Sequence, residues 1–281
     1  MAQDVLLTGA FGRVGTAIID HLGDRTAYDF TCLDRSPPAD SSPYAGYDAV
    51  VSDVTDEAGV RAAMEGRDAV IHLAGCPAPD GPWAEILENN VVGTYVVLDA
   101  AREADVERFV FASSNHVVGM YEVENAPEIY ARDFDLTVDH TAPHRPDSYY
   151  GTSKCFGEDL GRYYVEDRDA PGRFYALRIG NVQPPESDHP YAEAERGVAA
   201  GRWDRGSDAY ETAVARLKAM WQSRRDLAHL VDRCLGDATV AFDVFYGVSD
   251  NDRRWFDIDH AADVLGYDPQ DDGEAWDGPP E

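Results

Sequence analysis

Short apolar runs separated by segments of helical length dominate the first 180 residues of the chain. The runs are rich in Val, Ile and Phe and cover residues 5–8, 30–33, 49–52, 69–73, 109–112 and 174–179. Strands that alternate with helices are typical of right-handed βαβ units, because parallel strands need a crossover connection. The pattern therefore predicts an α/β fold, a Rossmann-type doubly wound parallel sheet, over residues 1–180.

The pattern changes after residue 180. A Pro184-Pro185 pair is followed by acidic and aromatic residues, and an amphipathic stretch covers residues 213–235. We expect residues 181–267 to form a small C-terminal substrate-binding portion. Residues 268–281 are acidic and rich in Gly and Pro, which predicts a mobile tail.

A glycine-rich loop joins the first predicted strand to the first predicted helix. Its spacing is GxxGxxG, and its predicted cofactor contacts are Gly9, Phe11, Gly12, Arg13, Val14 and Gly15. Glycines there let backbone amides approach a pyrophosphate at the start of a helix. A loop that merely turns is the alternative, but the position between strand and helix favours a dinucleotide site.

The residues that follow the later strands extend this predicted site. Asp34 stands where a carboxylate accepts hydrogen bonds from both hydroxyls of an adenosine ribose, which favours NAD. Arg35 beside it could attract the 2′-phosphate of NADP, and Asp34 could simply cap a loop. Further cofactor contacts are expected at strand ends, where ordinary turn residues are the alternative: Asp53, Val54, Leu73, Ala74, Gly75 and Ile179.

A tyrosine and a lysine form the clearest candidate for chemistry. Lys154 and Lys218 are the only lysines in the chain, and Lys154 follows Tyr150 by four residues. This spacing places a phenol and an ammonium on one face of a helix, as base-catalysed hydride transfer requires. A polar cluster, residues 113–116, ends a central strand, where open α/β sheets bind ligands. The alternative is a Tyr–Lys pair that occurs by chance on an ordinary helix.

The glycine loop, Asp34, the serine cluster and the Tyr–Lys pair together resemble the extended short-chain dehydrogenase/reductases over nearly the whole chain. The resemblance implies that Tyr150 is the acid/base and that Ser114 orients the reacting hydroxyl. It also implies that Lys154 lowers the pKa of Tyr150 and holds the nicotinamide ribose, and that Asn90 supports a proton-relay water. Asn90, Tyr150 and Lys154 are accordingly expected to contact the cofactor as well.

Four motifs are similar to those of the uronate dehydrogenases, which oxidise the anomeric carbon of sugar acids. They are residues 111–116, 145–147, 150–157 and 178–180. The resemblance implies substrate contacts at Asn115, His116 and Arg216. Two departures argue against a uronate: Asn181 replaces a serine of those enzymes, and residues 186–211 look like an insertion relative to them.

The insertion, with residues 119–122, 205–208 and 220–226, resembles the haloarchaeal NAD-dependent glucose-6-phosphate dehydrogenases. Residues 212–225 independently contain four basic residues and no acidic one: Arg216, Lys218, Arg224 and Arg225. A phosphate dianion needs such a positive wall. We expect Arg216 and Lys218 to contact the ligand, whereas a solvated helix face explains Arg224 and Arg225 equally well.

The predicted reaction is NAD-dependent oxidation of glucose 6-phosphate at C1 to 6-phosphogluconolactone. The expected substrate contacts are Ser114, Asn115, His116, Asn181, Arg216 and Lys218. The first alternative is a dehydrogenase of uronates or of free aldoses such as arabinose. Alternatives of other classes are a non-catalytic NAD-binding regulator and, disfavoured by chain length, a nucleotide-sugar epimerase.

The composition restricts partners and location. The 53 acidic residues exceed the 24 basic ones, and the net charge of −29 indicates adaptation to salt. Nucleic acids and anionic membranes are therefore poor partners. We expect a cytoplasmic protein, since no signal peptide or spanning run is visible, and a homo-oligomer that pairs through residues 90–104 and 150–165. The scattered cysteines and histidines predict no disulfide and no metal.

Overall fold

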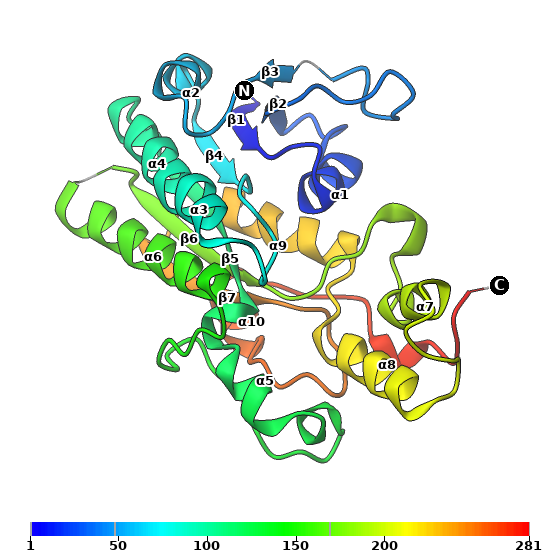
Figure 1. Ribbon diagram of the computed structural model, residues 1–281. Helices are drawn as coiled ribbons and strands as arrows, with labels where there is room; N and C mark the ends of the chain where they lie inside the picture. Colours follow the sequence, from blue (N-terminus) through cyan, green and yellow to red (C-terminus); the bar gives the residue numbers. More distant parts are fainter. Residues whose placement is uncertain (1, 48, 169, 281) are drawn as a thin grey trace.

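Seven parallel strands form one sheet in the order β3-β2-β1-β4-β5-β6-β7 (Figure 1). The computed structural model describes residues 2–47, 49–168 and 170–280. The strands are β1 (Gln3–Thr8), β2 (Tyr28–Asp34), β3 (Ala49–Val51), β4 (Ala69–His72), β5 (Arg108–Ser114), β6 (Arg173–Ile179) and β7 (Phe242–Gly247). The predicted Rossmann-type sheet and its six strands are confirmed. The strand β7 is an additional one that the pattern did not predict.

Helices cover both faces of the sheet (Figure 1). One face packs against α1 (Arg13–Leu22), α9 (Arg224–Gly236) and α10 (Asp259–Leu265), and the other against α2 (Glu57–Met64), α4 (Gly93–Glu103) and α6 (Tyr149–Tyr163). Successive residues of β1 serve opposite faces, with Leu7 in the first core and Leu6 in the second. Strands buried on both faces read as continuous apolar runs, which explains the pattern in the sequence.

The remaining helices are shorter or lie beyond the sheet. They are α3 (Trp83–Glu85), α5 (Met120–Asn125), α7 (Ala192–Ala199) and α8 (Asp208–Met220), with η1 (Ile86–Val92), η2 (Asn115–Val118), η3 (Glu128–Tyr130), η4 (Tyr164–Arg168), η5 (Pro185–Ser187) and η6 (Gly273–Ala275). In Figure 1, α5, α7 and α8 form a smaller lobe beyond the carboxyl ends of the strands. Within the described ranges, no helix is long and apolar enough to cross a membrane.

The boundary between the two predicted portions needs correction. Both β7 and α9 come from residues 181–267, yet β7 extends the sheet beside β6 and α9 packs against α1. The single amphipathic stretch is two helices, because Ser223 caps α9 by accepting a hydrogen bond from the Asp226 amide. The smaller lobe is therefore built mainly from segments inserted between elements of the sheet domain.

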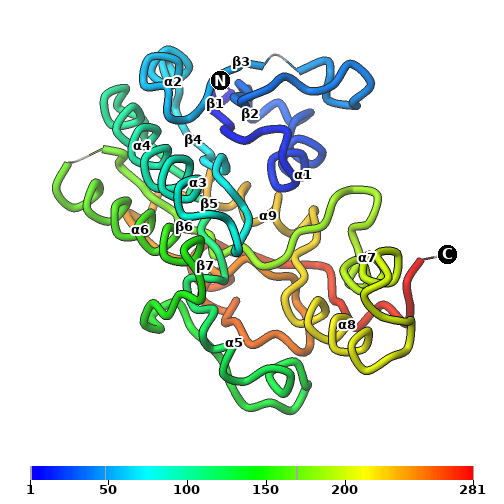
Figure 2. The backbone as a smooth tube through the Cα atoms, in the orientation of Figure 1, coloured from blue at the N-terminus to red at the C-terminus, as the bar shows by residue number. Residues whose placement is uncertain are grey.

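The predicted mobile tail is instead docked on the protein as far as residue 280; Glu281 lies outside the described residues. The buried carboxylate of Asp226 accepts hydrogen bonds from the amides of Gln270 and Asp271 at 2.9 and 3.1 Å. The Gly273 amide donates to Asn251 at 2.8 Å. Figure 2 shows the end of the chain returning beside α7 and α8. The prediction of a mobile tail from composition was wrong, because tertiary hydrogen bonds hold this acidic segment although it has little apolar surface.

The helices α4 and α6, which we expect to form a dimer interface, lie side by side on one face of the sheet. They expose large apolar side chains, among them Tyr95 at 46% and Tyr163 at 43%. Homo-oligomerisation stays a prediction.

A buried ion pair holds α6 against the sheet. Glu158 of α6 and Arg178 of β6 form two hydrogen bonds of 3.0 and 2.9 Å, and both side chains are 2% exposed. Ser113 of β5 donates to the same carboxylate, and His144 lies 3.0 Å from it. Burial alone would raise the pKa of Glu158, but the hydrogen bonds from His144 and Arg178 lower it to about 2. The carboxylate thus joins α6 to two strands whose ends carry the candidate site.

Replacing Arg178 with methionine tests this anchor. The variant leaves the Glu158 carboxylate buried without its ionic partner, so we expect the free energy of unfolding to fall by about 3–5 kcal/mol. Urea unfolding in concentrated KCl measures the loss. The control is Arg205→Met, which breaks an exposed pair with Glu195 and should cost at most about 1 kcal/mol. Equal small losses in both variants would contradict the anchoring role.

Candidate active site

A cleft of about 1280 Å³ runs across the carboxyl ends of the strands. Every predicted cofactor contact except Asn90 lines it, and so does every predicted substrate contact except Lys218. The cleft lies where the strand order reverses between β1 and β4, the position at which doubly wound sheets bind ligands. Its volume exceeds that of a typical pocket for one small molecule, so a dinucleotide and a second ligand can both be accommodated.

The glycine loop is shaped by close backbone contacts. Gly9 has a φ of +69°, and a Cβ there would lie 2.8 Å from the backbone nitrogen of Ala74. A Cβ on Gly15 would lie 2.4 Å from the carbonyl oxygen of Ala10. Only glycine fits both positions, which leaves the loop and the start of α1 open to the cleft. The residues present thus provide the cradle that a pyrophosphate requires.

A buried histidine orders the loop that follows β4, which packs against the glycine loop. His72 at the end of β4 lies 2.8 Å from the Thr8 hydroxyl and 3.2 Å from the Thr94 hydroxyl. Burial lowers the pKa of His72 to about 3, so the ring is neutral. The Thr8 hydroxyl also accepts hydrogen bonds from the amides of Leu73 and Ala74. This network is not apparent from the sequence, because His72 stands inside an apolar run and resembles a core residue.

Asp34 lies directly across from the glycine loop. Its carboxylate accepts a hydrogen bond from the Phe11 amide at 3.1 Å, and Arg35 lines the cleft next to it. Asp53 also lines the cleft, where it accepts hydrogen bonds from the amide and hydroxyl of Thr55. A carboxylate at this end of the cleft suits the two hydroxyls of an adenosine ribose and repels a 2′-phosphate.

The structure brings Ser114, Tyr150 and Lys154 to one wall of the cleft. Ser114 ends β5, while Tyr150 and Lys154 occupy the first turns of α6, which Ser148 caps through the Gly151 amide at 3.0 Å. A Cβ on Gly151 would lie 2.4 Å from the carbonyl oxygen of His116, so glycine permits α6 to start against η2, which directly follows β5. The Lys154 ammonium is buried and lies 5.6 Å from the centre of the Tyr150 ring.

The electrostatics of this group differ from the prediction. Burial lowers the pKa of Lys154 to about 8. Burial also raises the pKa of Tyr150, and the hydrogen bond from Ser114 offsets only part of that increase. In the protein residues alone the net shift of the Tyr150 pKa is therefore upward, and the lowering by Lys154 stays a prediction. The physical reason is that desolvation of the phenolate outweighs the protein groups that stabilise it.

His116 is fixed beside Tyr150 by a carboxylate. Its Nδ1 lies 2.7 Å from Asp147, and its ring meets the Tyr150 ring edge-on at 5.6 Å. Burial alone would raise the pKa of Asp147, but the hydrogen bond with His116 lowers it. This contact leaves Nε2 of His116 for a ligand, since His116 lines the cleft. Asn115 lines the cleft as well, with its amide 3.6 Å from the Met220 sulfur.

Asn90 has a different place from the one predicted. It is 2% exposed and does not line the cleft. Its amide contacts the backbone of Cys76 at 2.7 and 3.1 Å and the Ser153 hydroxyl at 3.1 Å. Asn90 therefore ties the loop after β4 to α6 next to Lys154. The geometry supports a positioning role, and it does not support the expected cofactor contact or water relay.

The two predicted phosphate ligands on α8 are separated. Arg216 lines the cleft, but it pairs with Glu122 at 2.6 Å and with Glu193 at 3.3 Å. Lys218 is buried, and its ammonium donates to the carbonyl oxygen of Trp276 at 2.9 Å and to Glu274 at 3.5 Å. The predicted substrate contact of Lys218 is wrong, because residues two apart on a helix point in different directions.

Other basic residues have roles that the sequence analysis did not resolve. Arg224 is buried and pairs with Asp20 at 2.6 Å, and Arg225 pairs with Asp271 at 2.7 Å, so both stabilise the fold. By contrast, Arg196 and Arg202 line the substrate end of the cleft. They were missed because no run of basic residues marks them: Arg196 follows Glu193 and Glu195, and Arg202 stands near Asp204.

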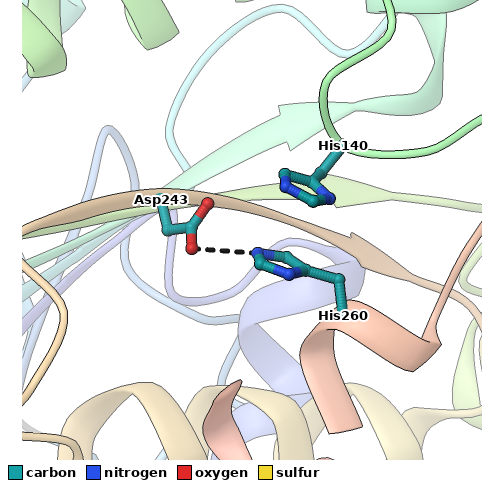
Figure 3. A group of neighbouring side chains, drawn as sticks. All are labelled: His140, Asp243 and His260. Atoms are coloured by element: carbon teal, nitrogen blue, oxygen red, sulfur yellow. Dashed lines mark hydrogen bonds and ion pairs between the residues drawn. The ribbon is translucent and has the colours of Figure 1, made fainter. Parts of the chain in front are cut away.

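One group of described side chains has the chemistry of metal ligands. His140, Asp243 and His260 place their ligand atoms within 4.8 Å of one another (Figure 3). The two imidazole rings stack at 3.5 Å with planes 9° apart, and His260 lies 2.9 Å from Asp243. A metal ion binds in the plane of an imidazole, so these nearly parallel rings cannot share one ion without turning. Three distant segments supply the residues, which explains why no spacing motif indicated them.

A family model described as the NAD dependent epimerase/dehydratase family matches residues 5–234. The chain belongs to this family. The NAD-dependent glucose-6-phosphate dehydrogenase of Haloferax volcanii is 46% identical over 96% of this chain and 94% of its own. The L-arabinose 1-dehydrogenase (NAD(P)(+)) of the same organism is 36% identical over 95% and 96%. Uronate dehydrogenase from Agrobacterium tumefaciens complexed with NAD superposes with a TM-score of 0.74, at 28% identity, over 98% and 87%.

The cofactor of the protein is NAD. The family model, the NAD-dependent relative and the NAD-bound structure agree with the cradle and with the carboxylate of Asp34. The predictions of NAD and of the extended short-chain dehydrogenase/reductase resemblance are thereby confirmed.

Replacing Tyr150 with phenylalanine tests the proposed acid/base. The variant removes only the phenolic oxygen, so we expect turnover to fall by about 10²–10⁴-fold while NAD binding stays unchanged. Steady-state rates and fluorescence titration with NADH measure the two effects. Tyr149→Phe is the matched control, since Tyr149 precedes Tyr150 on α6 and is 60% exposed. Retained turnover in Tyr150→Phe would remove this tyrosine from the chemistry.

Proposed function

We propose that the protein oxidises glucose 6-phosphate at C1 to 6-phosphogluconolactone with formation of NADH. The observation that carries the proposal is the positive end of the cleft beyond the Ser–Tyr–Lys group. Three arginines line the cleft there: Arg196, Arg202 and Arg216. In a chain of net charge −29, such a cluster favours an anionic substrate.

The class of reaction follows from the relatives and the site together. The relatives named above are dehydrogenases of a sugar phosphate, a free sugar and sugar acids. The protein is accordingly an NAD-dependent sugar dehydrogenase. The intact set of Ser114, Tyr150 and Lys154 argues against a non-catalytic NAD-binding regulator.

Tyr150, Ser114 and Lys154 each have a separate role in the proposed reaction. The phenolate of Tyr150 takes the proton from the C1 hydroxyl, and the Ser114 hydroxyl orients the same oxygen. Bound NAD supplies the acceptor for the hydride that leaves C1 as the C1 carbonyl forms. The buried ammonium of Lys154 interacts with no carboxylate among the described residues, so it is free to bind a ribose hydroxyl and to stabilise the phenolate.

His116 and Asn115 complete the pocket around the sugar. His116 holds its Nδ1 on Asp147 and directs its other nitrogen to the cleft, where it can bind a ring hydroxyl. Fixed polar groups of this kind lower the entropic cost of placing C1 for hydride transfer.

A uronate is the second candidate substrate. Arg216 lines the cleft one turn of α8 before Met220, whose sulfur lies 3.6 Å from the Asn115 amide, and a single guanidinium suits a carboxylate. This alternative keeps every catalytic residue and changes only the anion that the cleft binds.

Initial rates of NADH formation in concentrated KCl separate the candidates. Glucose 6-phosphate, glucose, glucuronate, galacturonate and arabinose are compared, each with NAD and with NADP. We expect the highest kcat/KM for glucose 6-phosphate with NAD, because a dianion gains most from the arginines. A higher kcat/KM for a uronate or a free sugar would contradict the proposal, and inactivity with all five would contradict the reaction class.

A further inference from the structure

The arginines of this protein fall into two groups. Most of them form an ion pair with a carboxylate within 4 Å. Among the residues that the structure describes, the arginines without such a pair are Arg13, Arg35, Arg67, Arg196 and Arg202. All of these except Arg67 line the cleft. Unpaired guanidiniums are therefore concentrated where ligands bind, in a protein with a large excess of carboxylates.

Two of the unpaired arginines belong to the cofactor end. Arg35 follows Asp34 at the ribose end, and Arg13 lies in the glycine loop, where its guanidinium donates to the carbonyl oxygen of Val182 at 3.3 Å. Arg196 and Arg202 remain, and both come from the smaller lobe. They are therefore the candidates for a second anion site.

Arg196 is oriented from the end of β6. Its Nη1 donates to Gln183 at 2.8 Å, and the side chain of Gln183 in turn bonds to Asn181, which lines the cleft. Glu193 precedes Arg196 by one turn of α7 and pairs with Arg216 at 3.3 Å. Arg196 thus lies on the face of α7 that adjoins Arg216, with its other guanidinium nitrogens available for a ligand.

Arg202 is held to α7 by a tryptophan. Its guanidinium lies 4.7 Å from the centre of the Trp203 ring, and the indole nitrogen donates to the carbonyl oxygen of Ala194 at 2.9 Å. A Cβ on Gly197 would lie 2.0 Å from the same ring, so glycine lets Trp203 pack directly on the helix. Arg196 and Arg202 therefore both belong to one rigid segment, in which Trp203 packs on α7.

The charges around the two arginines are only partly balanced by the protein. Burial lowers the pKa of Arg196, the neighbouring charges of Arg13 and Arg202 lower it further, and Glu193 acts in the opposite direction. Arg216, in contrast, is compensated by Glu122 and Glu193. A dianion between Arg196 and Arg202 would relieve their repulsion, whereas at Arg216 it would meet two carboxylates.

We propose that Arg196 and Arg202 bind the phosphate of a sugar phosphomonoester, while Arg216 contacts the sugar itself. The identity of the sugar rests on the proposed function, but the anion site does not. A phosphate could also be that of the cofactor, so the experiment measures sugar and cofactor separately.

Arg196→Ala, Arg202→Ala and the double variant are compared with the parent protein for KM and kcat. The matched control is Arg205→Ala, because Arg205 lies in the same segment, is paired with Glu195 and does not line the cleft. Loss of a charge-assisted hydrogen bond predicts a rise in KM for glucose 6-phosphate of about ten- to a hundredfold per arginine. KM for glucose and for NAD should remain that of the parent. Equal rises for glucose and glucose 6-phosphate, or a rise confined to NAD, would overturn the proposal.

Inhibition by inorganic phosphate tests the site even if glucose 6-phosphate is not the substrate. The reaction is then followed with whichever sugar the parent protein oxidises best. We expect inorganic phosphate to compete with the sugar and not with NAD, and the double variant to lose this inhibition while Arg205→Ala keeps it. Absence of inhibition in the parent, or inhibition that persists in the double variant, would refute the anion site. Failure of glucose 6-phosphate as a substrate refutes only the proposed function.

Discussion

The buried pair of Glu158 and Arg178 is the interaction on which the active site depends. It joins the middle of α6 to β6, and Ser113 adds β5 to the same carboxylate. Since β5 ends in Ser114 and the first turn of α6 carries Tyr150, the pair fixes the separation of the two groups that we propose bind one hydroxyl of the sugar. A buried ion pair gives little stability of its own, but its partners cannot exchange without exposing an uncompensated charge. It therefore specifies one arrangement of helix and strands.

The charge of the side chains that line the cleft changes from one end to the other. Asp34 lies at the ribose end, and a phenol and a buried ammonium occupy the middle. The unpaired guanidiniums of Arg196 and Arg202 line the end that we propose for the substrate. The rest of the protein pairs nearly all its arginines with carboxylates. An acidic surface suits a protein in concentrated salt, where its self-repulsion is screened. Positive charge left uncompensated at one place is then a strong indication of a bound anion.

The sequence predicted those features that follow from local patterns. Apolar runs predicted the strands, and the glycine spacing and the Tyr150–Lys154 interval predicted residues that line the cleft. Features that depend on contacts between distant segments were missed or misjudged. Lys218 was predicted to contact the ligand, but on α8 its side chain points toward Glu274. Arg196 was not predicted, because only the folded chain places it in the lining of the cleft. The raised pKa of Tyr150 likewise depends on burial, which no spacing reveals.

The central claim is that Tyr150 and Ser114 hold the C1 hydroxyl of a sugar phosphate while hydride leaves C1 for NAD. The most direct test is the oxidation of glucose 6-phosphate that carries deuterium at C1, with mass analysis of the reduced cofactor. The account predicts that the deuterium is transferred to the NADH that forms and that kcat/KM is lower than with the unlabelled sugar. Formation of NADH without deuterium, or no NADH at all, would contradict it.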